Sequence, residues 1–267
     1  MRTVGLITGS GFYEIDAELA PVERRLETPH GEVSLQEAEL AGHRLLAVAR
    51  HGSGHELLSH LVRHRANIWA LRELGAEAIV ATSVVGVMDA ALPLATPIVF
   101  DELYFPSNRL PDGSLATFFA APGDPERGHL ILSTPFSPTL RRRLADAARG
   151  EEIEVIEGGC YAHVDGPRFN TQAEIAALRA AGGTALSQTC GPETVLAAEL
   201  ELPFALLGFG VDYANGVKDQ PTSAEELSDN LVRHSAVASR IISRMLTDLA
   251  PDAELPFDTG FVFRMEG

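Results

Sequence analysis

Short apolar runs recur along the chain and alternate with segments whose apolar residues have helical spacing. The runs predict buried strands at residues 4–8, 45–49, 78–82, 97–100 (at a sheet edge), 130–133, 153–157, 184–187 and 204–211. Helical spacing predicts helices at residues 59–74, 138–148, 171–181, from 192 onward, and 223–249. Strands and helices that alternate in this way predict an α/β fold.

Local sequence signals mark the ends of several elements. Residues 171–174 and 223–226 have the spacing of capping boxes, and Gly75 is expected to end the first helix. Residues 160–169 are rich in glycine and proline and are expected to form a loop. Residues 106–128 form the longest irregular region, which is a candidate lid or subunit contact.

Composition narrows the class of protein. A chain of 267 residues with 45% hydrophobic content predicts one globular domain spanning 1–267. A net charge of −16 disfavours a nucleic acid or an anionic membrane as partner. Two cysteines cannot form a disulfide framework, and a strand predicted from the start of the chain leaves no room for a secretion signal, so a cytoplasmic location is expected.

The stretch from Ser187 to Asn215 is the first candidate for chemistry. A strand ends there, a helix follows, and a second buried strand leads to Asp212. Ligands in open α/β sheets bind at strand ends, so Thr189, Glu193 and Asp212 are candidate site residues. The alternative is structural: Thr189 shapes the turn before the helix, and Asp212 caps or solvates a strand end.

Two further strand ends carry groups suited to an anion. Gly9-Ser10-Gly11 is a turn whose backbone can approach a phosphate, although a plain tight turn fits equally and no dinucleotide-binding fingerprint follows. Arg50 and His51 precede two glycines and supply donors for phosphate or carboxylate, the alternative being a solvated loop. Histidines 51, 55, 60 and 64 lack acids or cysteines at ligand spacing, so no metal is expected.

Taken together and in order, these clusters resemble the methylthioadenosine phosphorylase and purine nucleoside phosphorylase family. The matching motifs are ITGSG, TPHGEVS, ARHGSGH, RANIWALRELG, TSVVG, GPRFNTQAE, QTCGPE and VDYAN. The resemblance implies a mixed, twisted sheet flanked by helices, a trimer with sites near subunit interfaces, and no cofactor. The reaction it implies is phosphorolysis, in which inorganic phosphate attacks the anomeric carbon of a purine nucleoside and releases the base.

The resemblance also assigns roles to residues of this chain. Phosphate would be held by Ser10, Arg50, His51, Ser83, the Val84 backbone N–H and Thr189. The base and ribose would lie against Phe169, Asn170, Gln188, Asp212, Ala214 and Asn215. The 5′ end of the sugar would meet Ala224, Leu227 and, from a neighbouring subunit, His129. Asp212, protonated through burial, would donate to the purine N7 as the base leaves.

Three departures from the family's pattern bear on the substrate. Ala214 stands where members specific for 6-aminopurines have a second aspartate, Gln188 where methionine is usual, and Asn170 where serine is common. Asp212 favours an adenine-type base, and the expected substrate is 5′-methylthioadenosine or a close 5′-modified adenosine. The alternatives are a 6-oxopurine nucleoside phosphorylase, using inosine, guanosine or methylthioinosine, and a nucleoside-binding protein without turnover. A generic α/β hydrolase is disfavoured because the G-x-S-x-G motif is absent and neither cysteine has an evident histidine partner.

Overall fold

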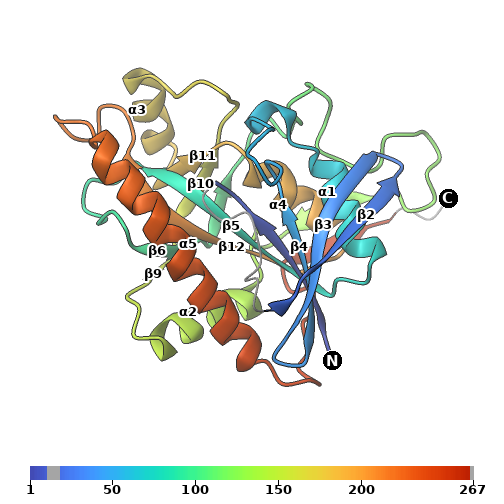
Figure 1. Cartoon of the computed structure of the whole chain (residues 1–267). Helices are drawn as coiled ribbons and strands as arrows, with labels where there is room; N and C mark the ends of the chain where they lie inside the picture. Colours follow the sequence, from blue (N-terminus) through green and yellow to red (C-terminus); the bar gives the residue numbers. More distant parts are fainter. Residues whose placement is uncertain (11–18, 265–267) are drawn as a thin grey trace.

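The computed structural model describes residues 1–10 and 19–264, and its centre is a large mixed sheet (Figure 1). The strands of this sheet are β1 (Thr3–Thr8), β2 (Val22–Thr28), β3 (Gly31–Leu40), β4 (His43–Ala49), β5 (Ala78–Val87), β6 (Pro97–Val99), β7 (Glu102–Tyr104), β9 (Ile156–Glu157), β10 (Cys160–His163), β11 (Ala185–Ser187) and β12 (Phe204–Tyr213). A separate antiparallel ribbon joins β8 (His129–Leu132) to β13 (Gly260–Phe263).

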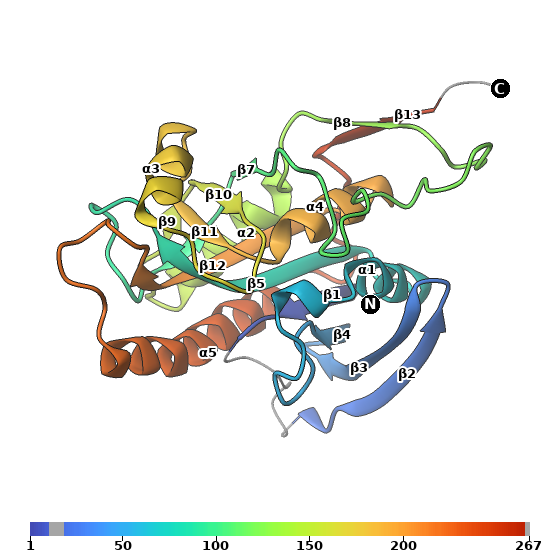
Figure 2. The ribbon, with the colours of Figure 1, turned by 90° about the horizontal axis from the view of Figure 1, so that it is seen from above.

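Helices cover both faces of the sheet (Figure 2). They are α1 (His64–Glu73), α2 (Pro138–Gly150), α3 (Gln172–Ala180), α4 (Cys190–Glu199), α5 (Ala224–Thr247) and the 3-10 turn η2 (Ser59–Leu61). Successive strand side chains point to opposite faces, so Ile7 of β1 joins the core under α1 and α4, whereas Leu6 joins the core under α2 and α5. Burial on both faces explains the continuous apolar runs.

Strand β5 is the branch point of the sheet. Along one edge it pairs in parallel with β1 as far as Ala81, and in antiparallel with β11 from Gly86 onward. Along its other edge it pairs in parallel with β12. On the first edge, residues 82–85 of β5 therefore lie between the end of β1 and the residues of β5 that pair with β11. This opening places the backbone and side chains of Ser83 and Val84 where a ligand can reach them.

The predicted α/β class is confirmed, with local corrections. Residues 160–163, expected in a loop, form β10 between β7 and β11. The buried Tyr161 ring packs edge-on against Phe100, so tertiary burial outweighs the flanking glycines. Strand β6 is not at an edge, because it pairs with both β12 and β9.

The remaining differences concern helix boundaries and the tail. The helix expected over residues 59–74 is divided into η2 and α1, separated by the extended residue Val62. The C-terminal tail contains β13, which pairs with β8; no local sequence pattern predicted this strand. Both side-chain and backbone bonds of the capping box at residues 171–174 are present. Within the described residues, no helix is both long and apolar enough to cross a membrane.

Candidate functional site

A cavity of about 360 Å³ lies where several strands end. Residues after β1 and β4, the open stretch of β5, the end of β11, and the end of β12 all contribute to its wall. The loop before α3 and the N-terminal half of α5 complete it. The sheet's branch at β5 thus brings together strand ends that are far apart in the sequence. A volume of this size suits a small organic ligand.

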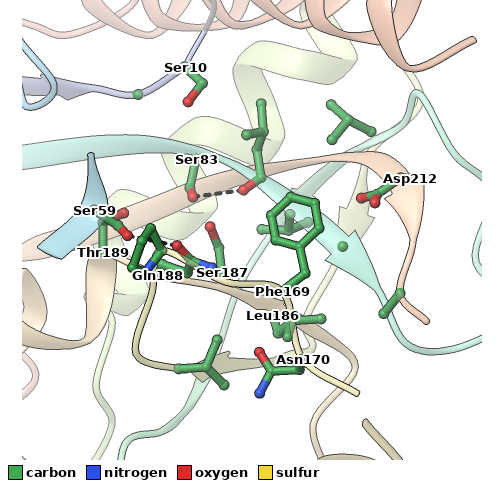
Figure 3. A pocket seen from close by; sticks show the side chains of 18 of the residues that line it. Ser10, Ser59, Ser83, Phe169, Asn170, Leu186, Ser187, Gln188, Thr189 and Asp212 are labelled. Atoms are coloured by element: carbon green, nitrogen blue, oxygen red, sulfur yellow. Dashed lines mark hydrogen bonds between the residues drawn. The ribbon is translucent and has the colours of Figure 1, made fainter. Parts of the chain in front are cut away.

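The two ends of the cavity differ in chemistry (Figure 3). At one end lie the hydroxyl groups of Ser10, Ser83 and Thr189. Toward the other end lie Phe169 and the carboxyl group of Asp212. The hydroxyl groups at the first end can donate to an anion, Ser83 after it turns from the Val84 carbonyl, to which it donates at 3.0 Å. The second end combines an aromatic ring with a titratable acid. Gly11 of the predicted turn lies outside the described residues.

Thr189 is held at the start of α4 by a residue that the sequence did not single out. The Tyr161 hydroxyl accepts hydrogen bonds from the backbone N–H groups of Thr189, at 3.4 Å, and Cys190, at 3.2 Å. The Thr189 side chain makes no capping bond to the helix, although it occupies the N-cap position. Its hydroxyl has a weak contact with Cys190 Sγ at 3.7 Å and can turn to a ligand in the cavity that Thr189 lines, which argues against a purely structural role.

Arg50 is almost fully buried, and its side-chain fork grips Glu193. Its Nε and Nη2 donate to the two Glu193 carboxylate oxygens at 2.7 and 2.8 Å. Its Nη1 donates to the Thr82 carbonyl at 2.7 Å. The bidentate hydrogen bonding of Arg50, predicted for a phosphate or carboxylate ligand, is thus directed to the Glu193 carboxylate in this structure. Burial opposes ionisation of both groups, but their mutual attraction outweighs it, raising the pKa of Arg50 and lowering that of Glu193.

His51 presents an acceptor rather than the expected donor. Its Nδ1 lies 2.7 Å from the Leu57 carbonyl oxygen, which can only accept, so Nδ1 carries the hydrogen. Burial and the neighbouring Arg50 charge lower the pKa of His51 to about 4, so the ring is neutral at pH 7. Its Nε2 therefore has a free lone pair.

The four histidines at positions 51, 55, 60 and 64 do not form a common site. His55 stacks on the His51 ring at 4.5 Å between centroids. His64 is buried beside Glu193, with Nδ1 at 3.7 Å from Oε1, and His60 is exposed. Among residues 1–10 and 19–264, no group of three histidine, cysteine, aspartate or glutamate side chains could hold a metal.

Asp212 is aimed by a β-bulge. The pairing of β12 with β5 shifts between Gly210 and Asp212, so Val211 is an extra residue, and both Val211 and Asp212 line the cavity. Burial raises the pKa of Asp212 to about 6. It is the only carboxyl group among the described lining residues, and its side chain has no hydrogen-bond partner in the part of the chain that the structure describes. The group can therefore be protonated near neutral pH, when it both donates and accepts.

The loop before α3 carries Phe169 and Asn170 to the mouth of the cavity. The Phe169 side chain is 76% exposed. The Asn215 amide donates to the Asn170 backbone carbonyl at 2.7 Å, so Asn215 fixes this loop. The Asn170 side-chain oxygen is buried and has no partner among the described residues. It is an unsatisfied acceptor that the protein covers in this structure, on a residue of the same cavity wall as the small, buried Ala214.

Gln188 and Ser59 form a link that no sequence pattern predicted. Ser59 donates to the Gln188 side-chain oxygen, and the Gln188 amide donates to the Arg168 carbonyl. Both polar ends of Gln188 are thereby engaged, although the residue lines the cavity. Ser59 itself had no distinguishing signal, because the apolar pattern placed it at the start of a helix.

Of the three residues predicted to meet the 5′ end of the sugar, one lines the cavity and two do not. Leu227 of α5 lines the cavity, together with Leu231, which sequence reasoning missed. Ala224 is exposed and is not part of the wall. His129 is exposed on the ribbon of β8 and β13, which extends from the body of the molecule, and it is not part of this wall either (Figure 2).

Comparison with known proteins gives a consistent set of relatives. A family model described as "Phosphorylase superfamily" matches residues 3–247. The chain is 32% identical to the 6-oxopurine nucleoside phosphorylase of Pyrococcus furiosus, over 91% of each chain. It is 34% identical to the probable S-methyl-5′-thioinosine phosphorylase of Methanopyrus kandleri, over 96% of each. The solved methylthioadenosine phosphorylase from Schistosoma mansoni, in complex with adenine, superposes with a TM-score of 0.81 at 25% identity, covering 92% of this chain and 91% of that one.

Proposed function

The chain belongs to the phosphorylase superfamily, as a pentosyltransferase of the nucleoside phosphorylase type, and on this premise we propose that its substrate is 5′-methylthioadenosine or a close 5′-modified adenosine. Inorganic phosphate is the co-substrate, and the reaction requires no cofactor. The products are adenine and the pentose 1-phosphate. The observation that carries the base assignment is the environment of Asp212.

The chemistry divides between the two ends of the cavity. A phosphate oxygen attacks C1′ of the sugar, and the bond from C1′ to the purine N9 breaks, so that its electron pair moves into the purine ring. Ser10, Ser83 and Thr189 orient the phosphate, whose own charge stabilises the cationic sugar. As negative charge builds on the base, protonated Asp212 donates its hydrogen to N7.

Asp212 favours an amino group at position 6 of the base. When protonated, the carboxyl group offers a donor to N7 and an acceptor to the neighbouring 6-amino hydrogen. A 6-oxo group would place its oxygen against the carboxyl oxygen that does not carry the hydrogen. Leu227 and Leu231 add apolar surface from α5, which suits a methylthio group better than a hydroxyl group.

A second candidate is phosphorolysis of a 6-oxopurine nucleoside. Ala214 offers no second carboxylate, so a 6-amino group has one acidic partner instead of two. The unpartnered Asn170 oxygen, once its side chain turns into the cavity, would accept from the N1–H that a 6-oxopurine carries and an adenine lacks. Two of the relatives described above are named for 6-oxopurine or thioinosine substrates, which gives this candidate further support.

Base release from four nucleosides separates the candidates. Methylthioadenosine, adenosine, inosine and methylthioinosine are each incubated with the chain, with and without phosphate, and the free base is measured by chromatography. Phosphate-dependent adenine release, fastest from methylthioadenosine, is the expected result. Hypoxanthine release as the dominant product would replace the 6-amino assignment with the 6-oxo one. Absence of base release from all four would favour the nucleoside-binding protein.

Replacement of Asp212 tests its role within the same assay. Asp212→Ala is expected to lose most of kcat, roughly a hundredfold or more, while the affinity for phosphate is retained at the far end of the cavity. The matched variant Asp165→Ala removes an exposed acid of the loop before α3 and should leave turnover unchanged. Comparable turnover in Asp212→Ala would remove this residue from the mechanism.

We also propose a homotrimer in which a neighbouring subunit supplies His129, since this residue is outside the cavity of its own chain. Light scattering after size-exclusion chromatography measures the assembly. His129→Ala is expected to raise KM for the nucleoside without changing the affinity for phosphate. A fully active monomer would contradict this arrangement.

A further inference from the structure

We propose that Glu193 is a positioning residue, which orients the Arg50 guanidinium so that a single N–H of Nη1 reaches the phosphate. This inference rests on the proposed function, because it takes phosphate as the anion in the cavity. Glu193 itself has no contact with the cavity: it is fully buried on α4 and does not appear in the wall. Of the two titratable side chains that it contacts, Arg50 lines the cavity and His64, at 3.7 Å, does not, so its effect on the reaction would pass through Arg50.

Most N–H donors of the Arg50 guanidinium are already engaged within the protein. A guanidinium has five N–H donors. Nε–H and one Nη2 hydrogen bind Glu193, one Nη1 hydrogen binds the Thr82 carbonyl, and the second Nη2 hydrogen is directed to Cys190 Sγ at 3.7 Å. One hydrogen on Nη1 is left. Because only this one is free of contacts with the described residues, its direction decides whether Arg50 binds the anion at all.

The position of Nη1 agrees with this assignment. A Cβ atom at Gly9 would lie 2.6 Å from Nη1, so the guanidinium touches the backbone of the turn that holds Ser10. Ser10 is one of the hydroxyl residues at the anion end of the cavity. The free N–H is thus located beside the turn proposed to bind phosphate. Glycine at position 9 is required for this close approach.

Glu193 also compensates the charge of Arg50. Among the described lining residues, Arg50 is the only arginine or lysine, and His51 is neutral at pH 7. An incoming phosphate therefore meets an ion pair and several directed donors, not a bare cation. Phosphate affinity then depends more on the direction of each hydrogen bond than on the attraction between net charges.

Two variants of Glu193 separate its effect on the orientation of Arg50 from its effect on the charge of Arg50. Glu193→Gln keeps the size of the side chain but turns one acceptor into a donor that faces a guanidinium N–H, so the fork is expected to rotate. Glu193→Asp keeps the charge but draws the carboxylate back by one methylene. Positioning predicts that both variants lose phosphate affinity, by roughly tenfold or more, the value of one charged hydrogen bond. If Glu193 only weakens the charge of Arg50, Gln would tighten phosphate binding and Asp would leave it unchanged.

Glu199→Gln is the matched control. Glu199 is on the same helix, is also largely buried, and accepts a 2.6 Å hydrogen bond from the Phe118 backbone N–H, away from the cavity. Its replacement perturbs α4 without touching Arg50. Phosphate affinity of the Glu199→Gln variant is expected to equal that of the unaltered chain, even if its melting temperature falls.

The experiment titrates inorganic phosphate into the full-length chain and its variants by calorimetry, and then measures KM for phosphate and for the nucleoside. Weaker phosphate binding in both Glu193 variants, with KM for the nucleoside changed less than about twofold, supports the inference. Unchanged phosphate binding in a folded Glu193→Asp variant overturns it. Phosphate binding without turnover in the unaltered chain would refute the proposed function alone, whereas no phosphate binding by that chain would refute both.

Discussion

The Ser59 hydroxyl donates a 2.7 Å hydrogen bond to the side-chain oxygen of Gln188. The amide end of Gln188 donates to the Arg168 carbonyl at 3.0 Å. Gln188 therefore ties the turn at η2 to the loop that carries Phe169, across the wall of the cavity. The backbone at Gly166 packs directly against this pair, where any side chain would collide with Ser59 Oγ and Gln188 Oε1. Gln188 is thus a structural link between two walls of the site.

Loss of this link is expected to weaken nucleoside binding selectively. Gln188→Leu removes both hydrogen bonds and Ser59→Ala removes one, so KM for the nucleoside should rise by roughly three- to tenfold, with KM for phosphate nearly constant. Steady-state kinetics of the two single variants and the double variant measure the coupling between the residues. Strictly additive effects would show that the hydrogen bond does not matter for binding.

His51 is expected to distinguish phosphate from sulfate. Its Nδ1 hydrogen is directed to the Leu57 carbonyl, so Nε2 is an acceptor. Hydrogenphosphate can donate a hydrogen to Nε2, whereas sulfate has none to give at neutral pH. Phosphate should therefore bind roughly tenfold more tightly than sulfate, and His51→Gln, whose amide can also donate, should reduce that preference. Competition of the two anions in the base-release assay checks this, and equal affinities would show that His51 donates.

The activity should depend on the protonation of Asp212. Burial raises the pKa of this group to about 6 from 3.8, and the protonated form is the one that donates to N7. The turnover rate is expected to fall as the pH rises through about 6. Asp212→Asn removes this decline and shifts preference toward 6-oxo bases, because an amide donates to the oxygen at position 6. A pH profile of kcat that is the same in both proteins would assign the decline to another group.

His234 is expected to make the fold sensitive to acid. Its ring is 1% exposed, packs near Phe209, and has no hydrogen-bond partner among the described residues. Burial and the charge of Arg50 lower its pKa to about 4 from 6.5. Between those pH values the unfolded chain binds more protons than the folded chain, so this contribution to stability is complete above pH 6.5 and is lost as the pH falls toward 4.

His234→Leu should therefore be more stable than the unaltered chain at pH 5, with a smaller difference at pH 7.5. The expected gain at pH 5 is about 1–3 kcal/mol. Urea denaturation at both pH values, at one fixed protein concentration, measures it. His60→Leu, which replaces an exposed histidine, is the control and should not alter the dependence on pH. A parallel decline in all three proteins would exclude His234 as the cause.

The sequence by itself determined the class of fold and the family. Apolar runs and helical spacing are local properties, so they located β1, β4, β5 and β12 to within a few residues. The ordered motifs at strand ends also predicted which segments carry the chemistry. Ser10, Ser83, Thr189 and Asp212, predicted from four separate motifs, all line one cavity. Most of these motifs are a strand end together with the turn that follows it. Ser83 is the exception: it was expected after a strand ending at residue 82, but β5 continues to Val87 and contains it.

Only the tertiary structure decided how these groups are used. Whether Arg50 faces an anion or Glu193 depends on a contact across 143 residues, which no local spacing contains. The protonation states of His51 and Asp212 follow from burial, and the aim of Asp212 follows from a bulge in the pairing of β12 with β5. Strand β10 and the link from Ser59 to Gln188 likewise exist because distant segments meet. Pairing and desolvation are properties of the folded chain, and they set the chemistry of the site.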